Sequence, residues 1–157
     1  QGQRFQQLRQ AEKLIAERIG PIVHRSSYYE TEAWGKTDQA DFINQALAVQ
    51  TRLPPLAVLQ TQLAIEQALG RVRKEKWAAR HIDIDLLFYA NQVLTLPELT
   101  LPHPQLHLRN FVLIPMMEIA ANFLHPILKM TIEELYLHSR DQMEVRLLEK
   151  ATKMNLE

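Results

Sequence analysis

The sequence predicts a domain of the mixed α/β or α+β class, in which helices cover a small sheet. Some segments place apolar residues at the three- and four-residue spacing of a helix, and others concentrate β-branched and aromatic residues. The two kinds of segment intermingle along the chain. Its 157 residues, of which 46% are hydrophobic and 23% charged, are enough for one core and are typical of a globular protein.

The first element is predicted to be a helix. Its apolar face consists of Phe5, Leu8, Ala11, Ile15 and Ile19. Gly20-Pro21 should end it, because glycine is a common C-terminal cap and proline cannot continue the hydrogen bonds. Residues 22–30 and 42–51 are rich in β-branched, aromatic and other apolar residues, and we expect a strand from each.

A second helix is predicted to begin at Pro54-Pro55 and to end at Gly70. Its apolar stripe is predicted at Leu56, Leu59 and Leu63. Residues 82–89 follow as the next predicted strand, and residues 90–92 can turn the chain.

The last third of the chain predicts two more helices. Two prolines bracket His103, so residues 101–104 cannot form a regular helix. Residues 111–121 are apolar enough for a buried helix, with Pro115 expected in its first turn. A capping box at 131–134 opens a final helix that we expect to run to about Lys150. We therefore expect a single domain over residues 1–150, with 151–157 as a disordered tail or a cloning remnant.

Composition removes several function classes. The absence of cysteine excludes disulfide scaffolds, cysteine-zinc sites and thiol catalysis. No apolar run reaches the length of a membrane helix and no signal peptide opens the chain, so a cytoplasmic location is expected. The net charge of +0 argues against a dedicated nucleic-acid binder. The charges are nevertheless unevenly distributed. Residues 1–80 have a net charge of +4, and residues 81–157 have a net charge of −4.

Asp83 and Asp85 stand near the point where the two halves meet. In a strand, residues two apart face the same side, so both carboxylates should point one way and Ile82, Ile84 and Leu86 the other. Parallel carboxylates repel unless a cation lies between them, and Mg²⁺ favours one or two carboxylates with phosphate oxygens and water. The alternative is a pair of solvated acids on an exposed strand face.

A basic segment, residues 71–80, precedes these acids and holds five basic residues. In an extended conformation Arg71 and Arg73 would point one way, and Arg80 stands three residues before Asp83. Arginines that bind phosphate, beside carboxylates that bind Mg²⁺, are the combination that phosphoryl transfer needs. The segment is expected to be a mobile loop that closes over a polyphosphate, and an ordinary solvated basic loop is the alternative. With four glycines in the chain, no glycine-rich phosphate loop is possible.

Residues 76–87, Lys-Trp-Ala-Ala-Arg-His-Ile-Asp-Ile-Asp-Leu-Leu, resemble a family signature of Arg, two residues, Asp-aliphatic-Asp and two aliphatic residues. Further resemblances follow in chain order at 26–31, 41–44, 70–73, 101–104 and 109–111. The family is 6-hydroxymethyl-7,8-dihydropterin pyrophosphokinase of folate biosynthesis. The resemblance runs from about residue 3 to about residue 150, which makes it highly specific.

The resemblance implies a ferredoxin-like three-layer α-β-α sandwich around a mostly antiparallel sheet. It also implies the transfer of the terminal diphosphate of ATP to the hydroxymethyl oxygen of a reduced pterin, with release of AMP and the help of two Mg²⁺ ions. ATP and the pterin would be the partners of a monomer that binds neither nucleic acid nor membrane.

Residue roles follow from the same resemblance. The metals would be held by Asp83 and Asp85. The catalytic residues would be Arg71, Arg80, Asp83 and Asp85. ATP would be bound by Glu66, Arg71, Arg73, Trp77, Arg80, Ile84, Thr100, His103 and Arg109. The pterin would be bound by Thr31, Trp34, Phe42, Asn44 and Phe111. Phe42 and Asn44 share one face of a predicted strand, so an aromatic platform and an amide would meet one flat ring.

The chain departs from the family pattern in three places. Members begin with a strand that ends in Gly-Ser-Asn, and the given sequence starts where that motif would end, so we expect this first strand to be missing from it. Glu98 and Leu63 stand where some members carry a basic and a polar nucleotide contact. Glu32 and Trp34 replace smaller residues. These changes bear on nucleotide affinity and on loop packing.

Three alternative functions remain open from the residues alone. A non-catalytic nucleotide- or RNA-binding module would use residues 71–80, and its binding would weaken steeply with salt and persist without Mg²⁺. A Mg²⁺-dependent nuclease or glycosyltransferase would also use an Asp-x-Asp pair. A zinc site at His103 and His107 is the weakest, because Pro104 breaks any helix between them. The first two do not account for the face formed by Phe42 and Asn44.

Overall fold

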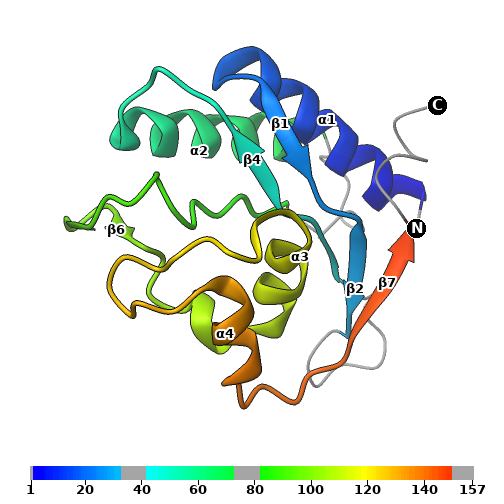
Figure 1. The fold of residues 1–157 in the computed structure, drawn as a ribbon. Helices are drawn as coiled ribbons and strands as arrows, with labels where there is room; N and C mark the ends of the chain where they lie inside the picture. Colours follow the sequence, from blue (N-terminus) through cyan, green and yellow to red (C-terminus); the bar gives the residue numbers. More distant parts are fainter. Residues whose placement is uncertain (1, 33–41, 73–81, 150–157) are drawn as a thin grey trace. The chain divides into compact units, whose positions relative to one another are not determined.

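The computed structural model describes residues 2–32, 42–72 and 82–149 of the chain (Figure 1). The remaining residues include Trp34, Arg73, Trp77 and Arg80, so the predictions made for them lie outside the described residues. The described chain divides into two compact units. Unit 1 comprises Gln1–Val23 and Val49–Leu86, and unit 2 comprises His24–Ala48 and Leu87–Glu157.

Unit 1 is built around two helices that pack on each other, α1 (Gly2–Arg18) and α2 (Pro55–Val72). The first helix buries Ala11 and Ile15, as its apolar face predicts. Gly20 follows α1 at a close approach of the backbone: a Cβ atom there would lie 1.8 Å from the carbonyl oxygen of Gln50. Glycine is therefore required at this position for steric reasons.

The second helix differs from its prediction in two respects. Its buried residues are Val58, Gln62, Ile65 and Leu69. Leu63, which was expected in the apolar stripe, is 51% exposed, because the buried face of the helix follows positions 58, 62, 65 and 69 rather than the leucines at 56, 59 and 63. Gly70 does not end the helix, which continues to Val72. A single glycine weakens a helix but does not stop it.

Each of the first two predicted strands is interrupted in the middle. Residues 22–30 form β1 (Ile22–Arg25) and β2 (Tyr28–Thr31), and residues 42–51 form β3 (Phe42–Asn44) and β4 (Leu47–Val49). The hydroxyl of Ser26 explains both breaks, because it accepts a hydrogen bond from the Ala46 N–H at 2.8 Å and donates one to the Ser27 carbonyl at 2.7 Å. These side-chain bonds compete with a regular ladder. The strand β1 pairs with β4.

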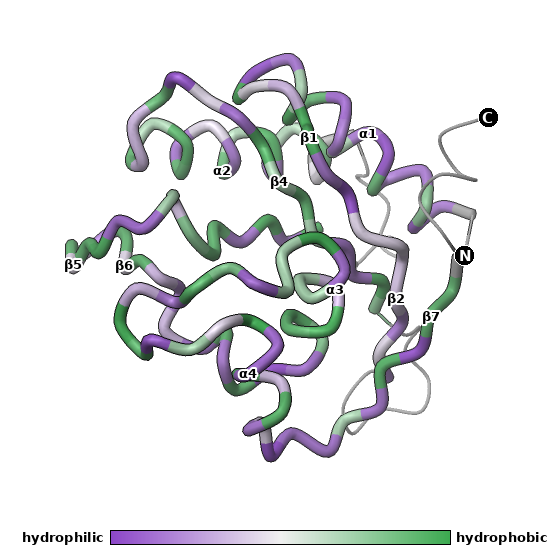
Figure 2. The backbone as a smooth tube through the Cα atoms, viewed as in Figure 1, coloured by the Kyte–Doolittle hydropathy of each residue, from purple (hydrophilic) through white to green (hydrophobic). Residues whose placement is uncertain are grey.

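The main sheet of unit 2 has the order β3-β2-β7 and is antiparallel throughout. The helix α3 (Asn110–Ala120) packs against this sheet and against α4 (Ile132–Leu137). Hydrophobic residues predominate along α3 (Figure 2). The core that they help to form contains Ala46, Leu106, Leu113, Met116, Ile132 and Leu135. The described structure thus confirms the predicted mixed class with antiparallel strands.

Pro115 lies in the second turn of α3, not in the first turn as predicted, since the helix begins at Asn110. Proline at this position removes the N–H that would bond to the carbonyl of Phe111. The ring of Pro115 is fully buried, so packing supports the helix where one backbone hydrogen bond is lost.

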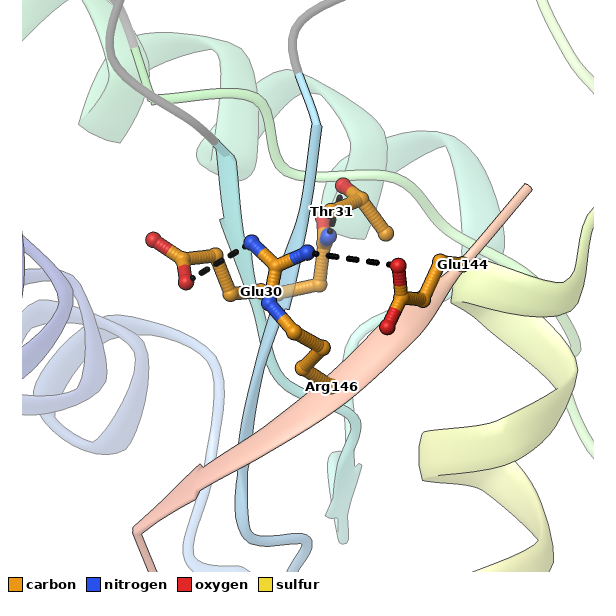
Figure 3. A network of polar contacts seen from close by, with 5 residues as sticks. Glu30, Thr31, Glu144 and Arg146 are labelled. Atoms are coloured by element: carbon orange, nitrogen blue, oxygen red, sulfur yellow. Dashed lines mark hydrogen bonds and ion pairs between the residues drawn. The ribbon is translucent and has the colours of Figure 1, made fainter.

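The final helix is much shorter than predicted. Its capping box is present, since the Thr131 hydroxyl accepts the Glu134 N–H and the Glu134 carboxylate accepts the Thr131 N–H. The helix nevertheless ends at Leu137, and residues 145–149 form β7 (Val145–Glu149) opposite β2. Arg146 lies between Glu30 of β2 and Glu144, at 3.1 and 3.7 Å (Figure 3). Pairing with a strand far away in sequence overrides the local preference for a helix.

Residues 82–89 do not form the predicted strand. Within the described residues no strand pairs with this segment, and a ladder needs a partner.

The chain then turns into a two-stranded hairpin, β5 (Leu94–Thr95) and β6 (Thr100–Leu101), followed by the short 3₁₀ helix η1 (Leu106–Leu108). Residues 101–104 are not helical, as predicted. No helix in the described part of the chain is long and apolar enough to span a membrane.

Candidate active site

Residues 82–86 of unit 1, which we call the acidic segment, present two carboxylates on one side. Asp83 and Asp85 are exposed, whereas Ile82, Ile84 and Leu86 are half-buried. This alternation confirms the predicted facing of the side chains, although the segment belongs to no ladder. The two carboxylates therefore belong to the exposed side of this segment.

The helix α2 holds the acidic segment by two side chains. The Ile84 N–H donates to the Glu66 carboxylate at 2.5 Å, and the Gln62 amide nitrogen donates to the Ile84 carbonyl at 2.7 Å. Burial raises the pKa of Glu66, the hydrogen bond from Ile84 lowers it, and the charges of Asp83 and Asp85 raise it. The net effect is an increase, of which burial is the largest cause, and the smaller contributions of Asp83 and Asp85 show that Glu66 lies within electrostatic reach of both carboxylates.

The donor chemistry of the acidic segment fits a hard divalent cation, because carboxylate oxygens are the ligands that Mg²⁺ prefers. In the three described ranges, no group of three or more His, Asp or Glu side chains is arranged to hold a metal ion. A cation at Asp83 and Asp85 would therefore complete its shell with water or with phosphate oxygens.

Arg71 does not have the extended backbone that was predicted for it, because it lies in the last turn of α2. Since Arg73 lies outside the described residues, the predicted common direction of the Arg71 and Arg73 side chains remains a prediction. Arg73 and Arg80 are outside the described residues, and their phosphate-binding roles remain predictions.

In unit 2, the strand β3 carries Phe42 and Asn44 two residues apart, as predicted. Phe42 is 46% exposed, which is unusual for a phenylalanine that serves only the core. The Asn44 amide nitrogen donates to the hydroxyl of Thr31, on the neighbouring strand β2, at 3.2 Å. This bond fixes the orientation of the Asn44 amide and so determines which edge it presents.

Phe111 lies in the first turn of α3, a helix that contacts β3. The guanidinium of Arg109 sits over the Phe111 ring, 5.8 Å from its centroid, which is a cation–π distance. The two aromatic residues predicted to stack a ring ligand thus lie on neighbouring elements of one unit.

Two other predicted nucleotide residues, Thr100 and His103, belong to unit 2, the first on a strand and the second in a loop. Thr100 is exposed on β6. The Nδ1 atom of His103 accepts the Gln105 N–H at 3.1 Å, so the ring is oriented by its own loop.

Sequence reasoning missed two polar residues that organise these regions. Gln62 is 4% exposed and bonds the acidic segment. The Glu118 carboxylate accepts hydrogen bonds from the N–H and hydroxyl of Ser27 and from the Tyr29 hydroxyl, each at 2.8 Å. Burial, with the bond to Glu118, raises the pKa of Tyr29 to about 12. The spacing of Gln62 and Glu66, one helical turn, was the available signal.

Comparison with known proteins identifies the family. The model of the 7,8-dihydro-6-hydroxymethylpterin-pyrophosphokinase family matches residues 1–121, so the chain belongs to this family. This membership agrees with the mixed α/β fold described above. It also confirms the resemblance found in the sequence motifs.

Named relatives are similar over most of this chain. They include 2-amino-4-hydroxy-6-hydroxymethyldihydropteridine pyrophosphokinases from three bacteria. The Synechocystis protein is 46% identical over 110 residues, which are 70% of this chain and 56% of that protein. The Haemophilus influenzae protein is 38% identical over 105 residues, 67% of this chain and 66% of that protein. The Methylorubrum extorquens protein is 46% identical over 101 residues, 64% of each. The matched region thus spans less than two thirds of the length of these relatives.

Proposed function

We propose that the chain transfers diphosphate from ATP to the hydroxymethyl group of 6-hydroxymethyl-7,8-dihydropterin, releasing AMP, as a step of folate biosynthesis. Family membership supports the reaction class, since the relatives are named as pyrophosphokinases of this pterin. The single structural observation that carries the proposal is the pair of exposed carboxylates, Asp83 and Asp85, projecting from one held segment.

In the proposed reaction the hydroxymethyl oxygen forms a bond to the β-phosphorus of ATP. The bond between that phosphorus and the oxygen bridging to the α-phosphorus breaks, AMP leaves with the electron pair, and the hydroxyl proton is released. The catalytic residues in this proposal are Arg71, Arg80, Asp83 and Asp85. Positive side chains suit this step, because the charge on the transferred group must be neutralised from several sides.

Asp83 and Asp85 would hold Mg²⁺, with two ions in the full assignment. When bound, the metal supplies charge neutralisation and orientation of the phosphate oxygens. The nucleotide would further contact Glu66, Arg73, Trp77, Ile84, Thr100, His103 and Arg109. Of these, Glu66 accepts a hydrogen bond from the N–H of Ile84 in the acidic segment, which supports their common assignment.

The pterin would stack between Phe42 and Phe111, with its heteroatom edge read by Asn44. The exposed ring of Phe42 and the hydrogen bond that orients Asn44 support this assignment. Thr31 and Trp34 would complete the pterin site. We further propose that the protein acts as a cytoplasmic monomer and that neither nucleic acid nor a membrane is its partner.

Product analysis tests the proposal. The chain is incubated with ATP, MgCl₂ and 6-hydroxymethyl-7,8-dihydropterin, and the nucleotides are separated by chromatography. Formation of AMP together with the pterin diphosphate is expected, and chelation of the metal with EDTA should stop it. Formation of ADP would instead indicate an ordinary kinase, and no pterin-dependent AMP would refute the proposal.

A further inference from the structure

The acidic segment is held from one side by a helix, and within the described residues no strand pairs with it. The N–H of Ile84 donates to Glu66 at 2.5 Å, and its carbonyl accepts from Gln62 at 2.7 Å. Both backbone polar groups of this one residue are therefore satisfied by side chains of α2. These two side-chain bonds satisfy the backbone N–H and carbonyl of Ile84, as hydrogen bonds to a neighbouring strand would do in a sheet.

Gln62 and Glu66 can act together because they lie four residues apart on α2, which places them on one face of the helix. Gln62 is 4% exposed, and burial of an amide is costly unless it is hydrogen-bonded. Its side chain is thus confined to the position where it meets the Ile84 carbonyl. The pair fixes the peptide group on each side of Ile84, that is, the links to Asp83 and to Asp85.

We infer that Gln62 is a positioning residue, which sets the direction and separation of the Asp83 and Asp85 carboxylates for a divalent cation. The cation in this inference rests on the proposed function. Groups that orient metal ligands from outside the coordination shell typically affect metal affinity strongly. A substitution of Glu66 would test this positioning role less specifically. It would also remove a carboxylate and a proposed nucleotide contact.

The test replaces Gln62 by methionine, which has similar length but cannot donate a hydrogen bond. Gln67→Met is the matched control, because Gln67 is exposed on the same helix. Binding of Mn²⁺ alone is measured by electron paramagnetic resonance of the free ion. Gln62→Met is expected to weaken Mn²⁺ binding about tenfold, and Gln67→Met should leave it unchanged.

Amide hydrogen exchange gives a second readout that does not need activity. The Ile84 amide should exchange faster in Gln62→Met than in the wild type or in Gln67→Met, since its segment has lost one of two attachments. Wild-type Mn²⁺ affinity together with wild-type exchange at Ile84 in Gln62→Met would overturn the inference.

If Gln62→Met fails to fold, as judged by far-ultraviolet circular dichroism, the wild-type protein decides the question. An Ile84 amide that exchanges as fast as an unstructured peptide would overturn the inference, and protection that rises on addition of Mn²⁺ would support it. The AMP assay is read separately. Gln62-dependent Mn²⁺ binding in a wild-type protein that makes no AMP would refute the proposed function and leave the positioning role intact.

Discussion

Asp83 and Asp85 present exposed carboxylates at the candidate site. The hydrogen bonds that hold their segment are made by the backbone N–H and carbonyl of Ile84, which lies between them. This division predicts that Asp85→Asn abolishes activity without disturbing the fold. The rate of AMP formation should fall at least about 100-fold, because the metal ion proposed to bind here would supply several kcal/mol of charge stabilisation. The free energy of unfolding in urea should stay within about 0.5 kcal/mol of the wild type.

The control for this change is Glu133→Gln, which removes a carboxylate from the exposed face of α4. It should leave both measurements as they are in the wild type. An Asp85→Asn protein with normal AMP formation would contradict the proposed role of the acidic segment.

Phe42 is the aromatic residue whose exposure points to a ligand. In Phe42→Ala the KM for the pterin should rise about tenfold while the KM for ATP stays constant, since stacking and apolar contact with the ring are lost. Steady-state kinetics with each substrate varied in turn measures this difference. Leu147→Ala, at a 56% exposed position of β7, is the control, and equal changes in both KM values would count against a pterin platform.

At the scale of elements, the short helix α4 depends on its N-terminus. Thr131→Ala removes one half of the capping box and should lower the free energy of unfolding by about 1 kcal/mol. Urea denaturation followed by circular dichroism measures this loss. Thr95→Ala, at an exposed position of β5, should cost much less, and an equal loss in the two variants would show that capping is not the cause.

The capped start of α4 depends on neighbouring residues and was predictable from sequence, whereas the strand β7 depends on a distant partner and was not. The capping box at Thr131 and Glu134 lies within four residues and was found. The strand β7 was mistaken for helix, because the contact that stabilises it joins Arg146 to Glu30, 116 residues away. The acidic segment was mistaken for a strand because its alternating burial is real, although side chains and not a ladder hold it.

The same distinction applies to the candidate site. The alternation around Asp83 and Asp85 and the pairing of Phe42 with Asn44 on one face could be read from a spacing of two residues. For Gln62 the only signal was its spacing of one helical turn from Glu66, because its hydrogen-bond partner Ile84 lies 22 residues away in sequence. The role of Glu118 could likewise not be predicted from the sequence, because its partners Ser27 and Tyr29 are about 90 residues away.

At the scale of the whole molecule, stability should depend on pH through His125. Its Nδ1 atom accepts hydrogen bonds from the N–H groups of Ile127 and Leu128, at 3.1 and 3.0 Å, so the ring must be neutral. Burial, with a smaller effect from His107, lowers the pKa of His125 below its usual 6.5. Stability is therefore full above the unfolded pKa and is lost as the pH falls from there through the lower, folded pKa.

The variant His125→Asn keeps a hydrogen-bond acceptor but cannot be protonated. Thermal unfolding of the wild type should shift to lower temperature between pH 7.5 and pH 5.5 by more than that of His125→Asn. His138→Asn, at an exposed position, should follow the wild type. Identical pH dependence in the wild type and in His125→Asn would exclude the buried ring as a contributor.

The two compact units are each discontinuous in the chain, and this has a consequence for synthesis on the ribosome. Unit 1 joins Gln1–Val23 to Val49–Leu86, and unit 2 joins His24–Ala48 to Leu87–Glu157. The helix α1 must therefore wait for α2 to emerge, and β2 must wait for β7, whose residues are made more than 100 positions later. Since pairings of such large sequence separation form slowly, the nascent chain should expose unpaired strand edges for most of its translation. Chaperone dependence of the yield in cells would thus be set by the order in which the segments are made rather than by the final stability.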